Sequence, residues 1–153
     1  MLTNRSEGTI GLLLADSARL LRLRIDRALE EAGLGLTAGE ARTLAYVAHS
    51  PASRQTALAA QMNVEPMTLV AFLDRLERRR LVVREPDPAD RRAKIVRLAP
   101  EAQPTLEQVH GITRKVEEAA LHDFCPEEIE MLQTLLKRIR ANITASETGR
   151  GQE

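Results

Sequence analysis

The sequence has 153 residues, with 22 basic and 22 acidic residues and a hydrophobic content of 43%. This length and composition predict one compact domain with a buried core and argue against wholesale disorder. No apolar run approaches the roughly 18 residues of a membrane-spanning helix, and the polar residues 1–8 lack the apolar centre of a secretory signal. One cysteine cannot close an internal disulfide, and no Cys/His cluster indicates zinc. We therefore expect a cytoplasmic protein without metal or cofactor.

The charges are unevenly distributed along the chain. Between Arg75 and Arg97 there are nine basic and four acidic residues, a net charge of +5, so the remainder carries −5. A basic patch of this kind predicts a nucleic-acid partner. The chain has only three aromatic residues, so its core must consist of aliphatic side chains, which suits packed helices.

The first half of the chain is predicted to be helical. Residues 8–32 carry apolar side chains at every third or fourth position, as a long helix with one buried face does. Thr37 with Glu40 three residues later predicts a capping box at the start of a second helix. Residues 53–61 are expected to form a short helix capped by Ser53.

The next segment has the pattern of a helix-turn-helix. Asn63 suits a left-handed turn, and Pro66 is tolerated in the first turn of the following helix. Leu69, Leu73 and Leu76, with Phe72, give that helix one apolar face. In a helix-turn-helix the second helix places its N-terminal residues in the major groove. The residues expected to face DNA are Ser53, Gln55 and Thr56 of the first helix and Pro66, Met67, Thr68, Ala71, Arg75 and Arg78 of the second.

A β-hairpin is predicted after the second helix. In residues 81–84 and 93–98 the spacing of the apolar residues changes from the helical period to the period of two that is typical of strands. Residues 86–90 between them are rich in proline and aspartate, which favour turns. Cations on a slim hairpin suit the negative potential of a minor groove. The DNA-contacting residues expected on this wing are Arg91, Arg92 and Lys94. We expect Asp90 to pair with Arg75 or Arg91 and so to fix the shape of the wing.

Two more helices are expected after Pro100 and Pro126, which suit first helical turns. The predicted fold is therefore mainly α, a winged helix-turn-helix of order α-α-α-α-β-β-α-α. Residues 37–99 would form the DNA-binding lobe. The dimerisation helices would be residues 8–36 and 100–144, and residues 1–7 and 145–153 would be flexible tails.

A homodimer is predicted from the apolar stripes on the first and last helices, which exceed what a small winged unit can cover by itself. Isologous pairing would bury these stripes and would place two recognition helices roughly 34 Å apart, one turn of B-DNA. The interface residues expected are Leu14, Leu21, Ile129, Leu132, Leu136 and Ile139.

Segments 64–77, 87–94 and 96–98 together resemble the MarR family, and most closely its SlyA-like branch. The resemblance extends from about residue 12 to residue 143. It implies a homodimeric bacterial transcription regulator, with repression as the expected mode, that binds a pseudo-palindromic operator and inserts Arg92 into the minor groove. It also implies a small phenolic or amphipathic anion as effector, bound between the dimer helices and the DNA-binding lobe. The cationic residues expected to meet such an effector are Arg19, Arg22 and His49.

Some positions carry residues that are unusual in that family. They are Ala41 in place of an aromatic residue, Ala71 in place of arginine, Arg80 in place of glycine and Ala99 in place of a threonine cap. The substitution at Arg80 predicts a strained or different C-cap after the recognition helix.

Other functions are compatible with parts of the sequence. The zero net charge and Ala71 would suit a winged-helix protein-interaction module. Cys125 could cap the last helix, where the helix dipole favours a thiolate, so a redox-sensing regulator is a second alternative. An enzyme is not expected, because the three histidines have no metal-ligand spacing and the sequence has neither a glycine-rich phosphate loop nor a nucleophile elbow.

Overall fold

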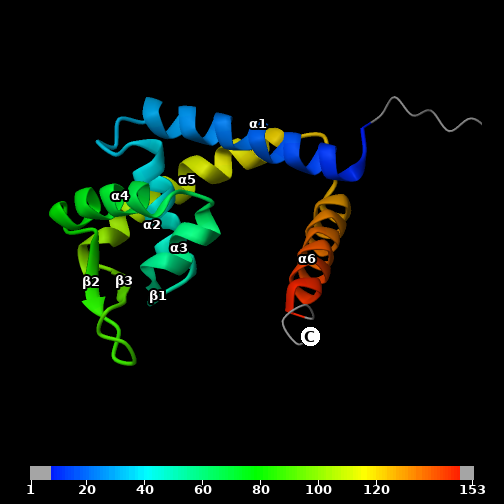
Figure 1. Cartoon of the computed structure of the whole chain (residues 1–153). Coiled ribbons are helices and arrows are strands. Elements are labelled where there is room, and N and C mark those ends of the chain that lie inside the picture. Colours follow the sequence, from blue (N-terminus) through cyan, green and yellow to red (C-terminus); the bar gives the residue numbers. More distant parts are fainter. Residues whose placement is uncertain (1–7, 149–153) are drawn as a thin grey trace, which may run out of the picture. The chain divides into compact units, whose positions relative to one another are not determined.

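A computed structural model describes residues 8–148 and confirms the mainly helical winged fold (Figure 1). The elements are α1 (Ile10–Glu31), α2 (Ala38–His49), β1 (Ser53–Arg54), α3 (Gln55–Met62), α4 (Pro66–Arg78), β2 (Val82–Pro86), β3 (Lys94–Leu98), a 3₁₀ turn (Pro100–Ala102), α5 (Gln103–Ala120) and α6 (Pro126–Thr148). The chain divides into two compact units, of which the first ends at Glu117 and the second begins at Glu118. Within the described residues, no helix combines the length and the apolar character needed to span a membrane.

Most predicted helix ends are found in the structure. Thr37 and Glu40 form the expected capping box at the start of α2, with the Thr37 N–H donating to Glu40 Oε2 at 3.0 Å. The last helix continues to Thr148, beyond the expected boundary at residue 144. The predicted tails 1–7 and, in part, 145–153 fall on residues that lie outside the described ones.

A small antiparallel sheet of order β1-β3-β2 completes the lobe. Strand β1 was not predicted from the sequence; its Ser53 pairs with Val96 and its Arg54 pairs with Ile95. Ser53 belongs to this strand, and its hydroxyl donates to the Ser50 carbonyl at 2.9 Å. The N-cap of α3 is Arg54, with no side-chain cap, so the prediction that Ser53 caps this helix is wrong.

The core of the lobe fixes the orientation of α4. Leu69, Leu73 and Leu76 are fully buried, as their spacing predicts. Phe72 is only half-buried, and it packs against α2 at Gly39, where a Cβ atom would lie 2.4 Å from the ring. Glycine therefore permits the close approach of α2 and α4. With one side of α4 held in this way, its opposite side faces outward.

Helices α1 and α6 carry much exposed apolar surface. Leu29 is the buried residue of α1, and α6 has none among those whose side chains are described. Of the predicted interface residues, Leu132 and Leu136 are exposed, and the half-buried ones are Leu14, Leu21, Ile129 and Ile139. The other exposed large apolar residues of these helices are Ile10, Leu12, Leu13, Leu20, Leu23, Met131, Leu135 and Ile143.

The C-terminus of α4 ends in a Schellman motif with arginine at the left-handed position. Arg80 has φ +57°, its N–H donates to the Glu77 carbonyl at 2.9 Å, and the Leu81 N–H donates to the Leu76 carbonyl at 2.9 Å. Glycine is the usual residue at this position because a side chain is strained there. The strained cap predicted for Arg80 is therefore present.

We predict that Arg80→Gly will raise the free energy of unfolding by about 1 kcal/mol, because it removes the strain of a left-handed arginine. Urea denaturation followed by circular dichroism measures this change. Arg78→Gly is the matched control, because it places glycine in the last turn of the same helix and should destabilise by about 1 kcal/mol. Destabilisation by both variants would contradict the assignment of strain to Arg80.

Candidate nucleic-acid interface

The turn between α3 and α4 presents the first residues of α4 to solvent. Asn63 adopts the predicted left-handed conformation, with φ +51° and ψ +49°, and Pro66 opens α4. Met67 is 77% exposed, and Pro66, Thr68 and Ala71 are exposed as well. These four predicted DNA-facing residues lie together on the outward side of α4. In the helix before them, Thr56 is exposed and Gln55 is half-buried.

Arg75 is held against α2 instead of extending freely from α4. Its Nε lies 2.5 Å from Glu40 Oε1, and its guanidinium stands 5.9 Å from the centre of the Phe72 ring. Glu40 is buried and also accepts the Thr37 N–H. One carboxylate therefore caps α2 and ties it to α4. The contact of Arg75 with Glu40 is not evident from the sequence, which predicts Arg75 only as a DNA-facing residue.

The other arginines at the end of α4 also have partners. Arg78 Nε donates to the Asp74 carbonyl at 3.2 Å, within its own helix. Arg79 donates to the carbonyls of Gly35 and Leu34 in the loop between α1 and α2. Both arginines remain exposed despite these hydrogen bonds.

The loop of the wing is organised by Asp87, which the sequence analysis treated only as a turn residue. Asp87 is buried, and its carboxylate accepts Arg54 Nε at 2.6 Å and the Ala89 N–H at 2.8 Å. These hydrogen bonds, that of Ala89 foremost, lower the pKa of Asp87. The Asp87 N–H closes the loop on the Ala93 carbonyl at 2.9 Å. The wing is therefore joined at its base to β1.

Asp90 shapes the tip of the wing through the backbone. Its Oδ1 accepts the Arg92 N–H at 3.1 Å, and its carbonyl accepts the Ala93 N–H at 2.9 Å. The expected ion pair of Asp90 with Arg75 or Arg91 is not found among the described residues, since Arg75 pairs with Glu40. The carboxylate instead folds the turn so that the predicted contact residues Arg91, Arg92 and Lys94 are all exposed.

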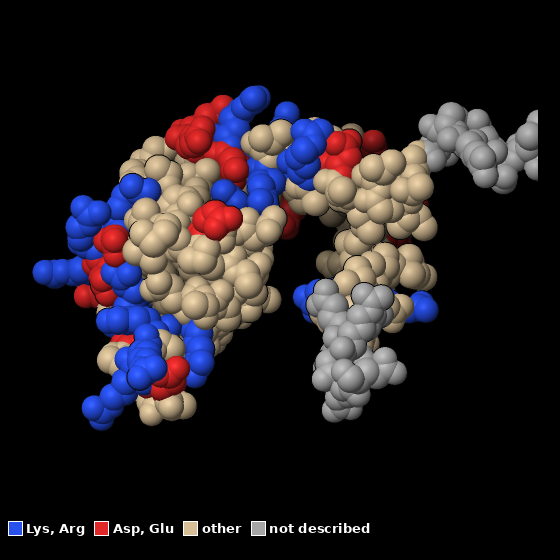
Figure 2. All heavy atoms as spheres, in the orientation of Figure 1, with Lys and Arg blue, Asp and Glu red and all other residues tan. Residues whose placement is uncertain are grey.

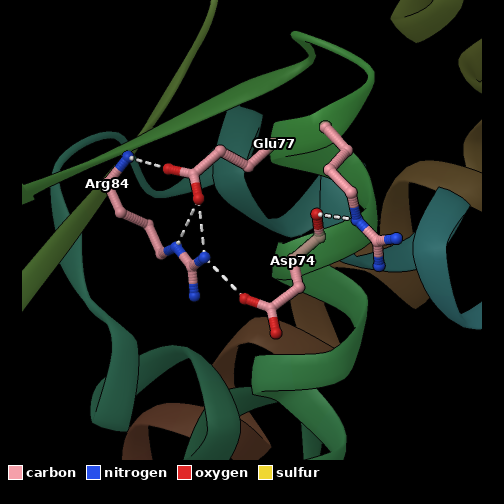
Figure 3. Close-up of polar contacts among 4 residues, drawn as sticks. Asp74, Glu77 and Arg84 are labelled. Carbon is pink, nitrogen blue, oxygen red and sulfur yellow. Dashed lines mark hydrogen bonds and ion pairs between the residues drawn. The ribbon is translucent and has the colours of Figure 1, made fainter.

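Arg84, on β2, joins the wing to α4 (Figure 3). Its Nη2 lies 2.6 Å from Asp74 Oδ1 and 2.6 Å from Glu77 Oε2, and its backbone N–H donates to Glu77 Oε1 at 3.2 Å. The side chain of Arg84 is only 17% exposed. The hydrogen bond from Arg84 lowers the pKa of Glu77, and the same contact raises the pKa of Arg84.

The contact of Arg84 with Asp74 and Glu77 was not predicted from the sequence. The available signal was the i, i+3 spacing of Asp74 and Glu77, which places two carboxylates on one side of α4. An arginine in a short strand that follows directly is the natural partner for such a pair.

Positive charge gathers over the lobe as the sequence predicts. Figure 2 shows Lys and Arg side chains over the β2–β3 hairpin and the neighbouring end of α4. The exposed cationic residues of this region are Arg75, Arg78, Arg79, Arg80, Arg91, Arg92, Lys94 and Arg97. The outward side of α4 and the cationic wing thus belong to the same lobe.

A separate cavity of about 360 Å³ lies among α1, α2 and α5. Most of its lining is apolar, and its polar residues include Arg22, Arg42, Tyr46 and Glu117. Arg42 Nε lies 3.1 Å from Asp26 Oδ1, but neither buried atom makes a well-oriented hydrogen bond. Arg22 is one of the cationic residues that the sequence analysis named for an effector.

Cys125 stands at the start of α6, as predicted, and is exposed. Its carbonyl accepts the Ile129 N–H at 3.2 Å, and Glu128 Oε2 accepts the Cys125 N–H at 2.9 Å. Glu128 therefore supplies the side-chain half of a capping box. Through these backbone hydrogen bonds, Cys125 is the N-cap residue of α6.

The family follows from comparison with known proteins. Residues 36–94 match the sequence model of the MarR family. The crystal structure of transcriptional regulator PA3341 is 33% identical, with 90% of this chain and 99% of that chain covered and a TM-score of 0.74. The chain belongs to the MarR family. That the chain belongs to the SlyA-like branch of this family stays a prediction.

Two further solved structures share the fold. A crystal structure of MarR is 23% identical over 97% of this chain and 99% of that chain, with a TM-score of 0.78. BpsR of Bordetella bronchiseptica, whose DNA binding is regulated by 6-hydroxynicotinic acid, is 21% identical over 92% of this chain and 98% of that chain, with a TM-score of 0.68.

We predict that the free energy of unfolding will fall as pH decreases below 4.5, in part through Glu77. The folded-state pKa of Glu77 lies below its ordinary value of 4.5. Its contribution is therefore complete above the unfolded-state pKa and is lost as pH falls through the folded-state pKa. Urea denaturation between pH 7 and pH 3 should show a shallower pH dependence for Glu77→Gln than for the wild type.

Arg84→Met provides the control for this pH dependence, since it removes the partner that lowers the pKa of Glu77. The Arg84→Met variant should show the same shallower profile. A Glu77→Gln profile parallel to that of the wild type over the whole range would contradict the prediction.

Proposed function

We propose that this MarR-family protein is a transcription regulator that binds a pseudo-palindromic DNA operator as a homodimer. The observation that carries the proposal is the joint exposure of the first turns of α4 and the cationic wing on one lobe. A helix of this kind fits the major groove, and arginine on a hairpin fits the minor groove. The regulator PA3341, at 33% identity, supports the same class of function.

Dimerisation is supported by the exposed apolar residues of α1 and α6. Ile10, Leu12 and Met131 are 71%, 65% and 59% exposed. Exposed apolar residues this numerous on two helices mark an interaction surface, and a second copy of the chain would cover them through an isologous contact. The dimer would then present two recognition helices to two half-sites.

The readout we propose for α4 is largely apolar. Pro66, Met67 and the methyl group of Thr68 can contact thymine methyl groups, while the Thr68 hydroxyl can bond to a base edge or a phosphate. Ala71 adds little polar contact. Phosphate contacts and the wing would therefore supply much of the affinity, and DNA shape part of the specificity.

We predict that Arg92→Ala will weaken operator binding by about 1 kcal/mol or more, roughly fivefold, because the wing loses its minor-groove cation. The operator is first selected from random or genomic DNA with the purified wild-type protein. Fluorescence anisotropy at several salt concentrations then gives the affinity and its salt dependence. Arg24→Ala, which removes an exposed arginine of α1, is the matched control for loss of charge.

Equal affinity of Arg92→Ala and the wild type would overturn the assignment of the wing. Failure to select any DNA, or an affinity independent of salt, would instead favour the protein-interaction alternative, since phosphate contacts make DNA binding steeply dependent on salt.

We also propose an amphipathic anion as effector, bound in the cavity of α1, α2 and α5. Its volume suits a small aromatic acid, and Arg22 and Arg42 supply positive charge to a mostly apolar lining that also contains Tyr46 and the acidic Glu117. Helix α2 belongs both to this cavity, through Arg42, and to the contact with α4, through Glu40. A ligand that prefers one position of α2 would therefore bias the position of α4.

We predict that 6-hydroxynicotinate, used as the probe, will raise the melting temperature and weaken operator binding. At 100 times its dissociation constant, a ligand that binds only the folded protein adds about 2.7 kcal/mol of stability. Arg22→Ala and Arg42→Lys should reduce both effects, while Arg24→Ala serves as the control. An equal thermal shift in all the variants would exclude this cavity as the binding site.

A further inference from the structure

We propose that Arg84 is a positioning residue that sets the orientation of the wing relative to the recognition helix α4. This inference rests on the proposed DNA binding, because its consequence is that the minor-groove contact of Arg92 depends on Arg84. Arg84 itself is mostly buried against α4 and need not touch DNA.

The geometry of the contact suits a rigid connection. One guanidinium nitrogen of Arg84, Nη2, lies 2.6 Å from a carboxylate oxygen of Asp74 and 2.6 Å from one of Glu77 (Figure 3). Its Nε lies 3.3 Å from the same Glu77 oxygen. The planar guanidinium presents these donors in a fixed arrangement that a lysine ammonium cannot reproduce. The backbone N–H of Arg84 also donates to Glu77, at 3.2 Å, so β2 is held by main chain and side chain together.

Because of the position of Arg84 along β2, its contact with α4 affects the orientation of the wing. Val82 is buried in the core, and Arg84 is the next residue on the same face of the strand. Pro86, two residues further, is exposed at the start of the loop. Arg84 therefore lies where the hairpin leaves the core, and across the ladder it is paired with Val96 of β3.

The second polar contact that holds the wing, that of Asp87, is made with β1 and not with α4. Asp87 binds Arg54 of β1 and closes the loop, but it has no contact with α4 in the hydrogen bonds and ion pairs of the described residues. Loss of Arg84 would leave the loop closed by Asp87. The hairpin would still be held by β1 and by its buried side chains, but it would lose these polar contacts with α4, so its angle to α4 could change without loss of its own fold.

A general effect on stability and a positioning effect give different results in a double-mutant cycle. If Arg84 acts through the wing, removing it should reduce the loss of affinity caused by Arg92→Ala. If it merely stabilises the fold, the two losses should add. Arg97→Met is the matched control, because Arg97 is a cation on β3 of the same hairpin that pairs with Glu85 and not with α4.

The first experiment measures operator affinity for the wild type, Arg92→Ala, Arg84→Met and the double variant, each shown by circular dichroism to be folded. We expect Arg92→Ala to weaken binding about fivefold in the wild-type background and less than about twofold in the Arg84→Met background. In the Arg97→Met background the effect should stay about fivefold. Arg84→Lys should restore part of the coupling. A fivefold effect of Arg92→Ala in the Arg84→Met background would overturn the proposal.

The second experiment needs no DNA. Spin labels at Ala71→Cys on α4 and Ala89→Cys on the wing, both exposed positions, report the distance between the two elements when the exposed Cys125 is first replaced by serine. We expect Arg84→Met to broaden or shift this distance distribution and Arg97→Met to leave it unchanged. An unchanged distribution in Arg84→Met would overturn the proposal even where DNA binding is confirmed. A changed distribution in a protein that selects no DNA would retain the role of Arg84 and reject the proposed function.

Discussion

The burial of three leucines on α4 is the constraint on which the lobe depends. Leu69, Leu73 and Leu76 have no exposed surface, and full burial of a leucine side chain stabilises a fold by about 1.5–3 kcal/mol. An exposed ion pair contributes about 0–1 kcal/mol. The leucines therefore decide which side of α4 faces the core. The side of α4 that is proposed to face DNA is therefore the side opposite these leucines.

Charged contacts then adjust the elements that the apolar core has placed. Glu40 holds α4 to α2 through Arg75, and Arg84 holds the wing to α4. Each contact has one mostly buried partner, Glu40 in the first and Arg84 in the second, and breaking such a contact leaves a charge poorly solvated. The lobe thus combines a core that sets position with a few ion pairs that set angle.

The sequence predicted the elements better than their connections. Periodicity and caps located α2, α4 and the hairpin, because the residues that decide them are close in the chain. Strand β1 was not predicted because a strand of two residues shows no hydrophobic periodicity, and because its partner on β3 lies far away in the sequence. The pairing of Arg75 with Glu40 likewise depends on the packing of α2 on α4. Local pattern cannot reveal such a contact, so the sequence predicted Arg75 as a DNA-facing residue without its partner Glu40.

The zero net charge of the chain is consistent with a DNA-binding lobe once its arginines are sorted by partner. Arg54, Arg75 and Arg84 pair with acidic residues of the lobe, and these pairs connect the elements of the scaffold and offset part of its charge. At the tip of the wing, Asp90 turns its carboxylate to the Arg92 N–H, and the side chains of Arg91 and Arg92 stay exposed. Phosphate attraction depends on charge at the contact surface and falls off within about a Debye length, roughly 8 Å at physiological salt. Acidic residues beyond that distance reduce the total charge of the protein without cancelling the field at the wing.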